Sequence, residues 1–149
     1  MKEEDADTVE HLPDRLASQH PNLVTEKGMA EIEAAVAEAR AAHAAAQASS
    51  DRASMAAAAR EIRYRSARRA SAQLVPASSD ISEVRFGATV TIVRDDGREQ
   101  TLRIDGEDEA DPAKGSISYV SPLARAMLGK IVGDVIPAGK GEAEITSVV

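Results

Sequence analysis

The chain has 149 residues, a formal net charge of −7 and an aromatic content of 2%. It contains no cysteine, which excludes disulfides and thiolate metal sites. No apolar run approaches the roughly 20 residues that span a bilayer, and the acidic N-terminus lacks the apolar core of a signal peptide. These features predict a cytoplasmic protein that does not enter a membrane.

The charge is unevenly distributed along the chain. Residues 1–38 hold ten acidic and three basic side chains, whereas residues 51–73 hold six arginines against Asp51 and Glu61. Residues 1–21, which two prolines interrupt, are predicted to be an acidic disordered tail. A protein this acidic, with one local basic segment, is not expected to coat free nucleic acid.

Residues 22–76 are predicted to form an antiparallel helical hairpin with a coiled-coil seam. The first helix should begin after Thr25, whose hydroxyl caps the first turn, and end near Ala48. The second should run from about Arg52 to Gln73, and the short connection makes the two helices antiparallel. Apolar residues at coiled-coil spacing define the first seam, and small residues define the facing stripe. The expected positions are Met29, Ile32, Val36, Ala39, His43 and Ala46, facing Ala56, Ala59, Arg63, Ala67, Ala70 and Leu74.

The connection between the helices, Ser49-Ser50-Asp51, leaves two roles open for Asp51. Its carboxylate could be a catalytic acid at the tip of the hairpin, or it could accept hydrogen bonds from free N–H groups at the start of the second helix. A single carboxylate beside a cation is a poor magnesium site, because Mg²⁺ takes several oxygens in a near-octahedral array. We therefore predict that Asp51 is a helix cap and only a weak candidate for a catalytic acid. No metal site is expected at His43 either, since no second His or Cys lies at ligand spacing.

A basic face is predicted on the second helix of the hairpin. Guanidinium groups bind both carboxylate and phosphate oxygens, so this face suits acidic protein surfaces or RNA phosphates. The alternative is a solvated helix whose arginines pair with Glu31, Glu33 and Glu38 across the hairpin. The basic hairpin face consists of Arg60, Arg63, Arg65, Arg68 and Arg69.

Residues 77–83 are predicted to be a linker, and residues 84–149 a domain built mainly of strands. Alternating, β-branched sequences predict strands at VRFGATVTIVR, EQTLRID, GSISYV, GDVIPA and EAEITSVV. The stretch SPLARAMLG predicts one short helix, with Ser121 as N-cap, Pro122 in the first turn and Gly129 at the end. The predicted fold class is α+β: an antiparallel helical hairpin followed by an antiparallel sheet with one short helix.

The run LRIDGEDEADPAKGSISYVSPLARAMLGKIVGDVI resembles the C-terminal domain of the bacterial Gre transcript-cleavage factors. The matching elements, in order, are a strand ending near Gly106, the acidic turn DEAD, ISYVSPLARAMLGK and VGD. In the N-terminal half, NLVTEKGMAEIEAAVAEAR resembles the family's opening Leu-Thr-x-x-Gly helix. The resemblance implies an FKBP-like antiparallel β-domain without isomerase function at residues 84–149.

The resemblance also implies a partner. In the family this domain docks on RNA polymerase at the rim of the secondary channel, through the start of the short helix. The corresponding residues here are Val120, Ser121, Pro122 and Arg125, and Val120 stands where family members often carry an acid. In the cleavage factors, two acids at the hairpin tip help to hold a second magnesium at the polymerase active centre.

This sequence departs from the cleavage factors at the hairpin. The tip offers only Asp51, and the hairpin is shorter by roughly twenty residues, or about 15 Å per arm. In this respect the chain is similar to the Gre-like regulators of nucleoside diphosphate kinase. We therefore predict a transcription elongation regulator, not an enzyme, that binds RNA polymerase, contacts RNA transiently and does not stimulate cleavage.

Two alternatives stay open. One is a cleavage-stimulating factor that uses Asp51 at the polymerase magnesium. The other is a Gre-fold interaction module whose partner is not polymerase. In each case we expect no cofactor, no small-molecule substrate and no membrane partner.

Overall fold

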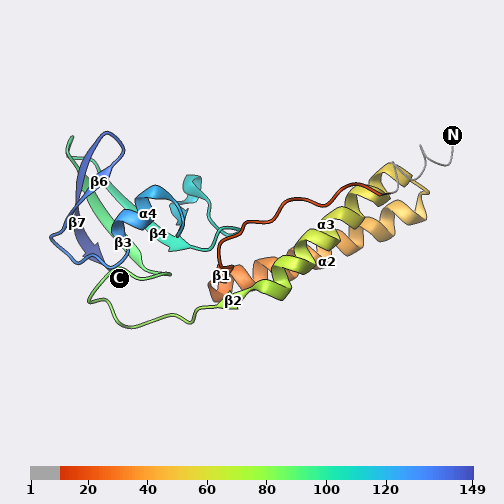
Figure 1. Cartoon of the computed structure of the whole chain (residues 1–149), viewed down its shortest axis with the longest axis horizontal. Helices are drawn as coiled ribbons and strands as arrows, with labels where there is room; N and C mark the ends of the chain where they lie inside the picture. Colours follow the sequence, from red (N-terminus) through yellow and green to blue (C-terminus); the bar gives the residue numbers. More distant parts are fainter. Residues whose placement is uncertain (1–10) are drawn as a thin grey trace. The chain divides into compact units, whose positions relative to one another are not determined.

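The computed structural model describes residues 11–149, whose elements are traced in Figure 1. The chain forms two compact units. Of the described residues, the hairpin unit comprises 11–21 and Met29–Ala72, and the C-terminal unit comprises Asn22–Gly28 and Gln73–Val149. The first part of the predicted tail, residues 1–10, lies outside the described residues. In chain order the elements are β1 (Leu23–Val24), α2 (Glu26–Ala48), α3 (Arg52–Ser71), β2 (Gln73–Leu74), β3 (Thr89–Arg94), β4 (Glu99–Asp105), the 3-10 turn η1 (Pro112–Lys114), β5 (Ser116–Ser118), α4 (Pro122–Met127), β6 (Val135–Ala138) and β7 (Gly141–Val148).

The hairpin unit is built from α2 and α3, which lie alongside each other in Figure 1. Four of the predicted seam positions on α2 are buried: Ile32, Val36, Ala39 and Ala46. The other two, Met29 and His43, are half-buried. The predicted seam of α2 is therefore confirmed, because the few branched apolar residues of this helix mark one side of it clearly.

The predicted stripe on α3 is wrong in its C-terminal half. Ala56 is buried as expected, but Ala67 and Ala70 are exposed, and Leu74 belongs to β2. Arg68, predicted to belong to the basic hairpin face, is only 3% exposed. Alanine occurs on every side of α3, so its sequence carries little information about which side is covered.

Residues 11–21 run beside α3 without forming a helix or strand of their own (Figure 1). Arg15 pairs with Glu61, and Asp14 pairs with Arg63. This differs from the solvated tail that the sequence predicts. The physical reason is electrostatic, because Asp14 of this segment pairs with an arginine of α3 and Arg15 pairs with a glutamate of α3.

The C-terminal unit contains a five-stranded sheet in the order β5-β4-β3-β7-β6. Three of its pairs, β3 with β4, β3 with β7 and β6 with β7, are antiparallel as predicted. The fourth pair, β4 with β5, is parallel, so the sheet is mixed and the prediction of a wholly antiparallel sheet is wrong there. The cause is the connection between these strands: it passes through η1, which lets β5 enter in the direction of β4. The α+β fold class is confirmed.

The core of the C-terminal unit lies between one face of this sheet and α4. Ala124 and Met127 of α4 are completely buried, as are Ile92, Ile104 and Ile145 of the three central strands. Burying a branched or methionine side chain stabilises a fold by about 1.5–3 kcal/mol. This cluster therefore holds α4 in place on the sheet.

A short parallel pair of strands, β1 and β2, joins the start of α2 to the chain that follows α3. The backbone N–H of Gln73 donates to the carbonyl of Asn22 at 2.8 Å, and that of Val75 to the carbonyl of Val24 at 2.9 Å. Both strands belong to the C-terminal unit. The base of the hairpin is thus part of the β-domain.

Candidate functional site

The start of α4 carries the residues that the sequence predicts to bind polymerase. Ser121 caps the helix, because its Oγ accepts the backbone N–H of Ala124 at 3.3 Å. Pro122 occupies the first helical position, where its missing N–H has no intrahelical partner to lose. The predicted cap and helix start are confirmed.

The outer side of α4 presents Pro122 and Arg125, which are exposed, while Val120 and Ser121 are half-buried. The turn before the helix is closed by Ser118: its Oγ accepts the N–H of Val120 at 3.2 Å, and its carbonyl accepts the N–H of Ser121 at 2.9 Å. The structure therefore places the four predicted residues in the turn before α4 and on α4 itself. The surface that they form carries one cation and a proline ring, which suits binding rather than catalysis.

Three exposed aliphatic side chains follow α4 and were missed by the sequence analysis. Ile131, Val132 and Val135 are 51%, 55% and 57% exposed. Val135 lies in the predicted strand GDVIPA, whereas Ile131 and Val132 precede it and had no predicted element. Exposed aliphatic groups gathered in one segment are typical of contact surfaces.

Asp51 lies at the tip of the hairpin and caps α3. Its Oδ1 accepts the backbone N–H of Ser54 at 3.1 Å, and its Oδ2 accepts the Ser54 hydroxyl at 2.7 Å. These two hydrogen bonds, from the hydroxyl first and the backbone second, hold the pKa of Asp51 below its ordinary value. The predicted helix cap is confirmed. Within residues 11–149, no cluster of three His, Asp or Glu side chains gathers to hold a metal ion.

The arginines of the predicted basic hairpin face lie in different surroundings. Arg69 pairs with Glu33 across the hairpin at 3.1 Å, whereas Arg63 pairs with Asp14 of the preceding segment. The remaining three differ among themselves in burial and surroundings. Arg65 lies 3.5 Å from Glu61 on its own helix, Arg68 is buried, and Arg60 has a buried Nε with no hydrogen-bond partner among the described residues.

A buried carboxylate at the base of the hairpin was also missed. Glu109 lies in the acidic turn DEAD, yet only 2% of its side chain is exposed. Its Oε2 accepts the backbone N–H groups of Thr25 at 2.9 Å and Gly106 at 3.2 Å, and its Oε1 accepts the Thr25 hydroxyl. The Thr25 hydroxyl in turn caps α2 by accepting the N–H of Gly28 at 3.0 Å. The predicted Thr25 cap is confirmed, and Glu109 completes it.

A second buried carboxylate lies next to this turn. Asp105 is completely buried, and Nε of Arg103 reaches its two oxygens at 2.8 and 3.0 Å. Nη2 of Arg103 lies 3.9 Å from Glu109. One arginine therefore serves two buried acids, which is the arrangement that makes buried carboxylates tolerable.

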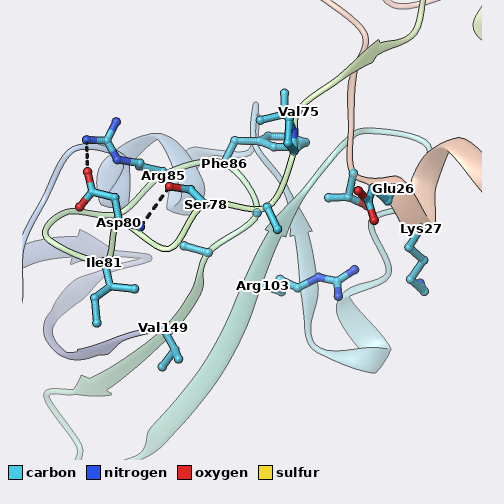
Figure 2. Close-up of a pocket in the computed structure, with 15 residues that line it drawn as sticks. Glu26, Lys27, Val75, Ser78, Asp80, Ile81, Arg85, Phe86, Arg103 and Val149 are labelled. Carbon is cyan, nitrogen blue, oxygen red and sulfur yellow. Dashed lines mark hydrogen bonds and ion pairs between the residues drawn. The ribbon is translucent and has the colours of Figure 1, made fainter.

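Figure 2 shows a pocket of about 240 Å³ beside this cluster, in the C-terminal unit. Its wall includes Phe86, Arg85 and Asp80 from the segment before β3. Arg85 pairs with Asp80 and with Glu83, each at 2.9 Å, so its charge is compensated within the protein. Phe86 packs edge-on against Tyr119, with the two ring centroids 5.7 Å apart. We assign no ligand to this pocket.

Comparison with known proteins places the C-terminal half in a family. Residues 78–149 match the family model described as transcription elongation factor, GreA/GreB, C-terminal. This half of the chain is a GreA/GreB C-terminal domain. The GreA/GreB resemblance of the sequence is thereby confirmed for the part that contains α4 and the five-stranded sheet.

Named relatives match the same GreA/GreB part of the chain. The transcription elongation factor GreB of Neisseria meningitidis serogroup B is 51% identical over 70 residues, which is 44% of this chain and 43% of that protein. The GreA of Hyphomonas neptunium is 53% identical over 73 residues, 46% of each chain. The chain thus matches less than half the length of these relatives.

Solved structures of GreA/GreB-type factors align with more of the chain but at low similarity. A GreA/GreB elongation factor from Nitrosomonas europaea aligns with 88% of this chain and 99% of its own, at 18% identity and a TM-score of 0.42. The GreA factor homologue Gfh1 of Thermus thermophilus aligns with 87% of this chain and 99% of its own, at 20% identity and a TM-score of 0.40. Among the described residues, no helix has the length and apolar character needed to cross a bilayer.

Proposed function

We propose that this protein is a transcription elongation regulator that binds RNA polymerase at the rim of the secondary channel and does not stimulate transcript cleavage. The polymerase partner is supported by the GreA/GreB domain at residues 78–149 and by relatives whose names describe elongation factors. The protein itself carries out no reaction under this proposal. It acts by occupying a surface that other factors also use.

The single observation that carries the proposal is the state of Asp51. Both of its carboxylate oxygens are bound by Ser54. A carboxylate that caps its own helix has to give up these hydrogen bonds before it can bind a metal ion, and the tip supplies no second acid. The tip is therefore suited to closing a helix rather than to holding magnesium.

The dimensions of the hairpin support the same conclusion. Helix α2 contains 23 residues and α3 contains 20. At 1.5 Å per residue the longer helix measures about 35 Å. Since the resemblance implies that cleavage factors have longer arms, this hairpin would fill the mouth of the channel without delivering an acid to the active centre.

Docking is assigned to the exposed side of α4. Pro122 and Arg125 face solvent there, and the buried side chains of Ala124 and Met127 keep the helix in place. A surface held by the core binds without first becoming ordered, which lowers the entropic cost of association. Transient contact with RNA through the exposed arginines of α3 belongs to the same proposal.

The proposal is tested by competition for purified RNA polymerase. A labelled cleavage factor is bound to the core enzyme, and the full chain is added in increasing amounts. We expect the label to be displaced completely, because both proteins need the same rim. Binding of the full chain to polymerase without displacement would overturn the secondary-channel site, and absence of binding would overturn the polymerase partner.

A further inference from the structure

One side of α3 is occupied by the chain's own residues 12–15, which we call the strap. Arg63 makes two contacts with it. Its Nε lies 2.5 Å from Oδ1 of Asp14, and its Nη2 donates to the carbonyl oxygen of Leu12 at 2.8 Å. Arg63 therefore binds a carboxylate and a backbone carbonyl of an extended segment. Its guanidinium group forms an anion subsite on α3.

A cation subsite of opposite character lies beside it. Nη1 of Arg15 reaches the two carboxylate oxygens of Glu61 at 2.9 and 2.8 Å. The same guanidinium lies over the ring of Tyr64, with its central carbon 3.8 Å from the ring centroid. A carboxylate and an aromatic face together are a favourable setting for a guanidinium group.

The strap is held in a way that permits release. In its two ion pairs the side chains are between 35% and 72% exposed, and such pairs are weak and screened by salt. Residues 11–18 belong to no helix or strand, and Leu16, directly after the strap, is 97% exposed. Within the strap only Leu12 is half-buried, while Pro13, Asp14 and Arg15 are exposed, so little apolar burial holds this contact.

We propose that this side of α3 is a binding site for an extended segment of a partner protein, and that the strap closes the site in the free protein. The strap shows what the site recognises: neighbouring acidic and arginine side chains on an extended backbone. A nucleic acid phosphate backbone fits less well, because it would satisfy Arg63 but meet the carboxylate of Glu61. The inference concerns α3 and is independent of polymerase docking by α4.

Closure by the strap is tested with trypsin, which cleaves after Arg15. In the free protein Arg15 is engaged by Glu61 and Tyr64, so cleavage there is slow. The variant Arg63→Ala removes the two contacts that Arg63 makes with the strap, leaves the cleavage site intact, and should accelerate cleavage after Arg15 at least fivefold. The matched control is Arg98→Ala, which removes an exposed arginine paired with Asp96 in the β3–β4 turn. Equal cleavage rates after Arg15 in the Arg63→Ala variant and the wild type would show that the strap does not close the site.

Binding is tested with a fluorescent peptide of this chain's residues 11–18, HLPDRLAS, added to the full-length protein. The released variant Asp14→Ala/Arg15→Ala should bind the peptide at least tenfold more tightly than the wild type, as measured by anisotropy. Adding Arg63→Ala to the released variant should abolish the gain. The control protein Asp96→Ala/Arg98→Ala carries the same two substitutions at another exposed pair and should behave like the wild type.

Two results would overturn the binding site. One is equal peptide affinity of the released variant and the wild type. The other is a gain that a peptide with alanine at both charged positions reproduces, because recognition would then not depend on the acid–arginine pair. A single-stranded RNA oligonucleotide is run in parallel, and a gain in RNA affinity without a gain in peptide affinity would overturn the assignment to a protein segment.

Discussion

Glu109 and Thr25 are 84 positions apart in the chain, and the carboxylate of one closes the helix start at the other. In an ordinary capping box, a glutamate three residues into the helix accepts the N–H of the cap residue. Here the helix has Gly28 at that position, and Glu109 performs the task from the turn after β4. The first turn of α2 is thereby attached to the β-domain.

Replacing Glu109 with alanine should lower the free energy of unfolding by about 1–3 kcal/mol. The reason is that the N–H groups of Thr25 and Gly106 lose a buried acceptor. The measurement is denaturant unfolding followed by circular dichroism. The control is Glu99→Ala, at an exposed glutamate of β4, which should change the unfolding free energy by less than about 0.5 kcal/mol. A loss for Glu109→Ala no larger than that of the control would contradict the role of this carboxylate.

Gly28→Ala should destabilise the protein, although alanine is the better helix former by about 1 kcal/mol. A Cβ at this position would lie 2.3 Å from Oε2 of Glu109. The unfolding free energies of Gly28→Ala, Glu109→Ala and the double variant form a double-mutant cycle. Once the glutamate side chain is gone, the alanine should cost nothing or stabilise. Strict additivity of the two losses would show that Gly28 and Glu109 do not meet.

Removal of the Asp51 carboxylate should reduce stability in a pH-dependent way. Hydrogen bonds from Ser54 lower the pKa of Asp51 below 3.8, so the ionised form is favoured in the folded state. Its contribution is therefore present above pH 3.8 and lost as the pH falls through the lower, folded-state pKa. Thermal unfolding of Asp51→Ala should show a lower midpoint than the wild type at pH 7, and the difference should shrink in acid.

The variant Asp51→Asn separates the capping role of that side chain from the contribution of its charge. Asparagine also caps helices well, so most of the stability at pH 7 should be retained while the pH-dependent part disappears. A stability difference between wild type and Asp51→Ala that stays constant from neutral pH into acid would contradict a charged cap.

Pro122→Glu should weaken binding to RNA polymerase by tenfold or more, without unfolding the β-domain. The side chain is exposed at the first turn of α4, where glutamate is well tolerated by a helix. The matched control is Pro112→Glu, which makes the same change at the exposed first position of η1. Binding is measured with purified core enzyme. Equal affinities of the two variants would argue against docking through α4.

The sequence was most informative where side chains of distinct character define a pattern. The branched residues Ile32 and Val36 marked the seam of α2, and Ser121 with Pro122 marked the start of α4. Asp51 was predicted as a cap because it directly precedes an uninterrupted helical stretch. In each case the interaction is local, so neighbouring positions carry the information.

The sequence was least informative where the interaction partner is distant in the chain. The acidic turn DEAD was identified only as a turn, and nothing near Glu109 in the sequence indicates that its carboxylate is buried against Thr25. The parallel pairing of β5 depends on the path through η1 rather than on strand composition. Arg63 was correctly placed on the hairpin, but its pairing with Asp14 could not be predicted. Alanine occurs on every side of this helix, so the sequence does not show which side of the helix is exposed.

The central claim is most directly tested with a halted, backtracked RNA polymerase complex that carries an end-labelled transcript. The full chain is added alone, and then together with a genuine cleavage factor. The account predicts no shortening of the transcript with this protein alone, and inhibition of the shortening caused by the cleavage factor. Shortened transcripts with this protein alone, lost in Asp51→Asn, would contradict it and would make Asp51 a catalytic acid.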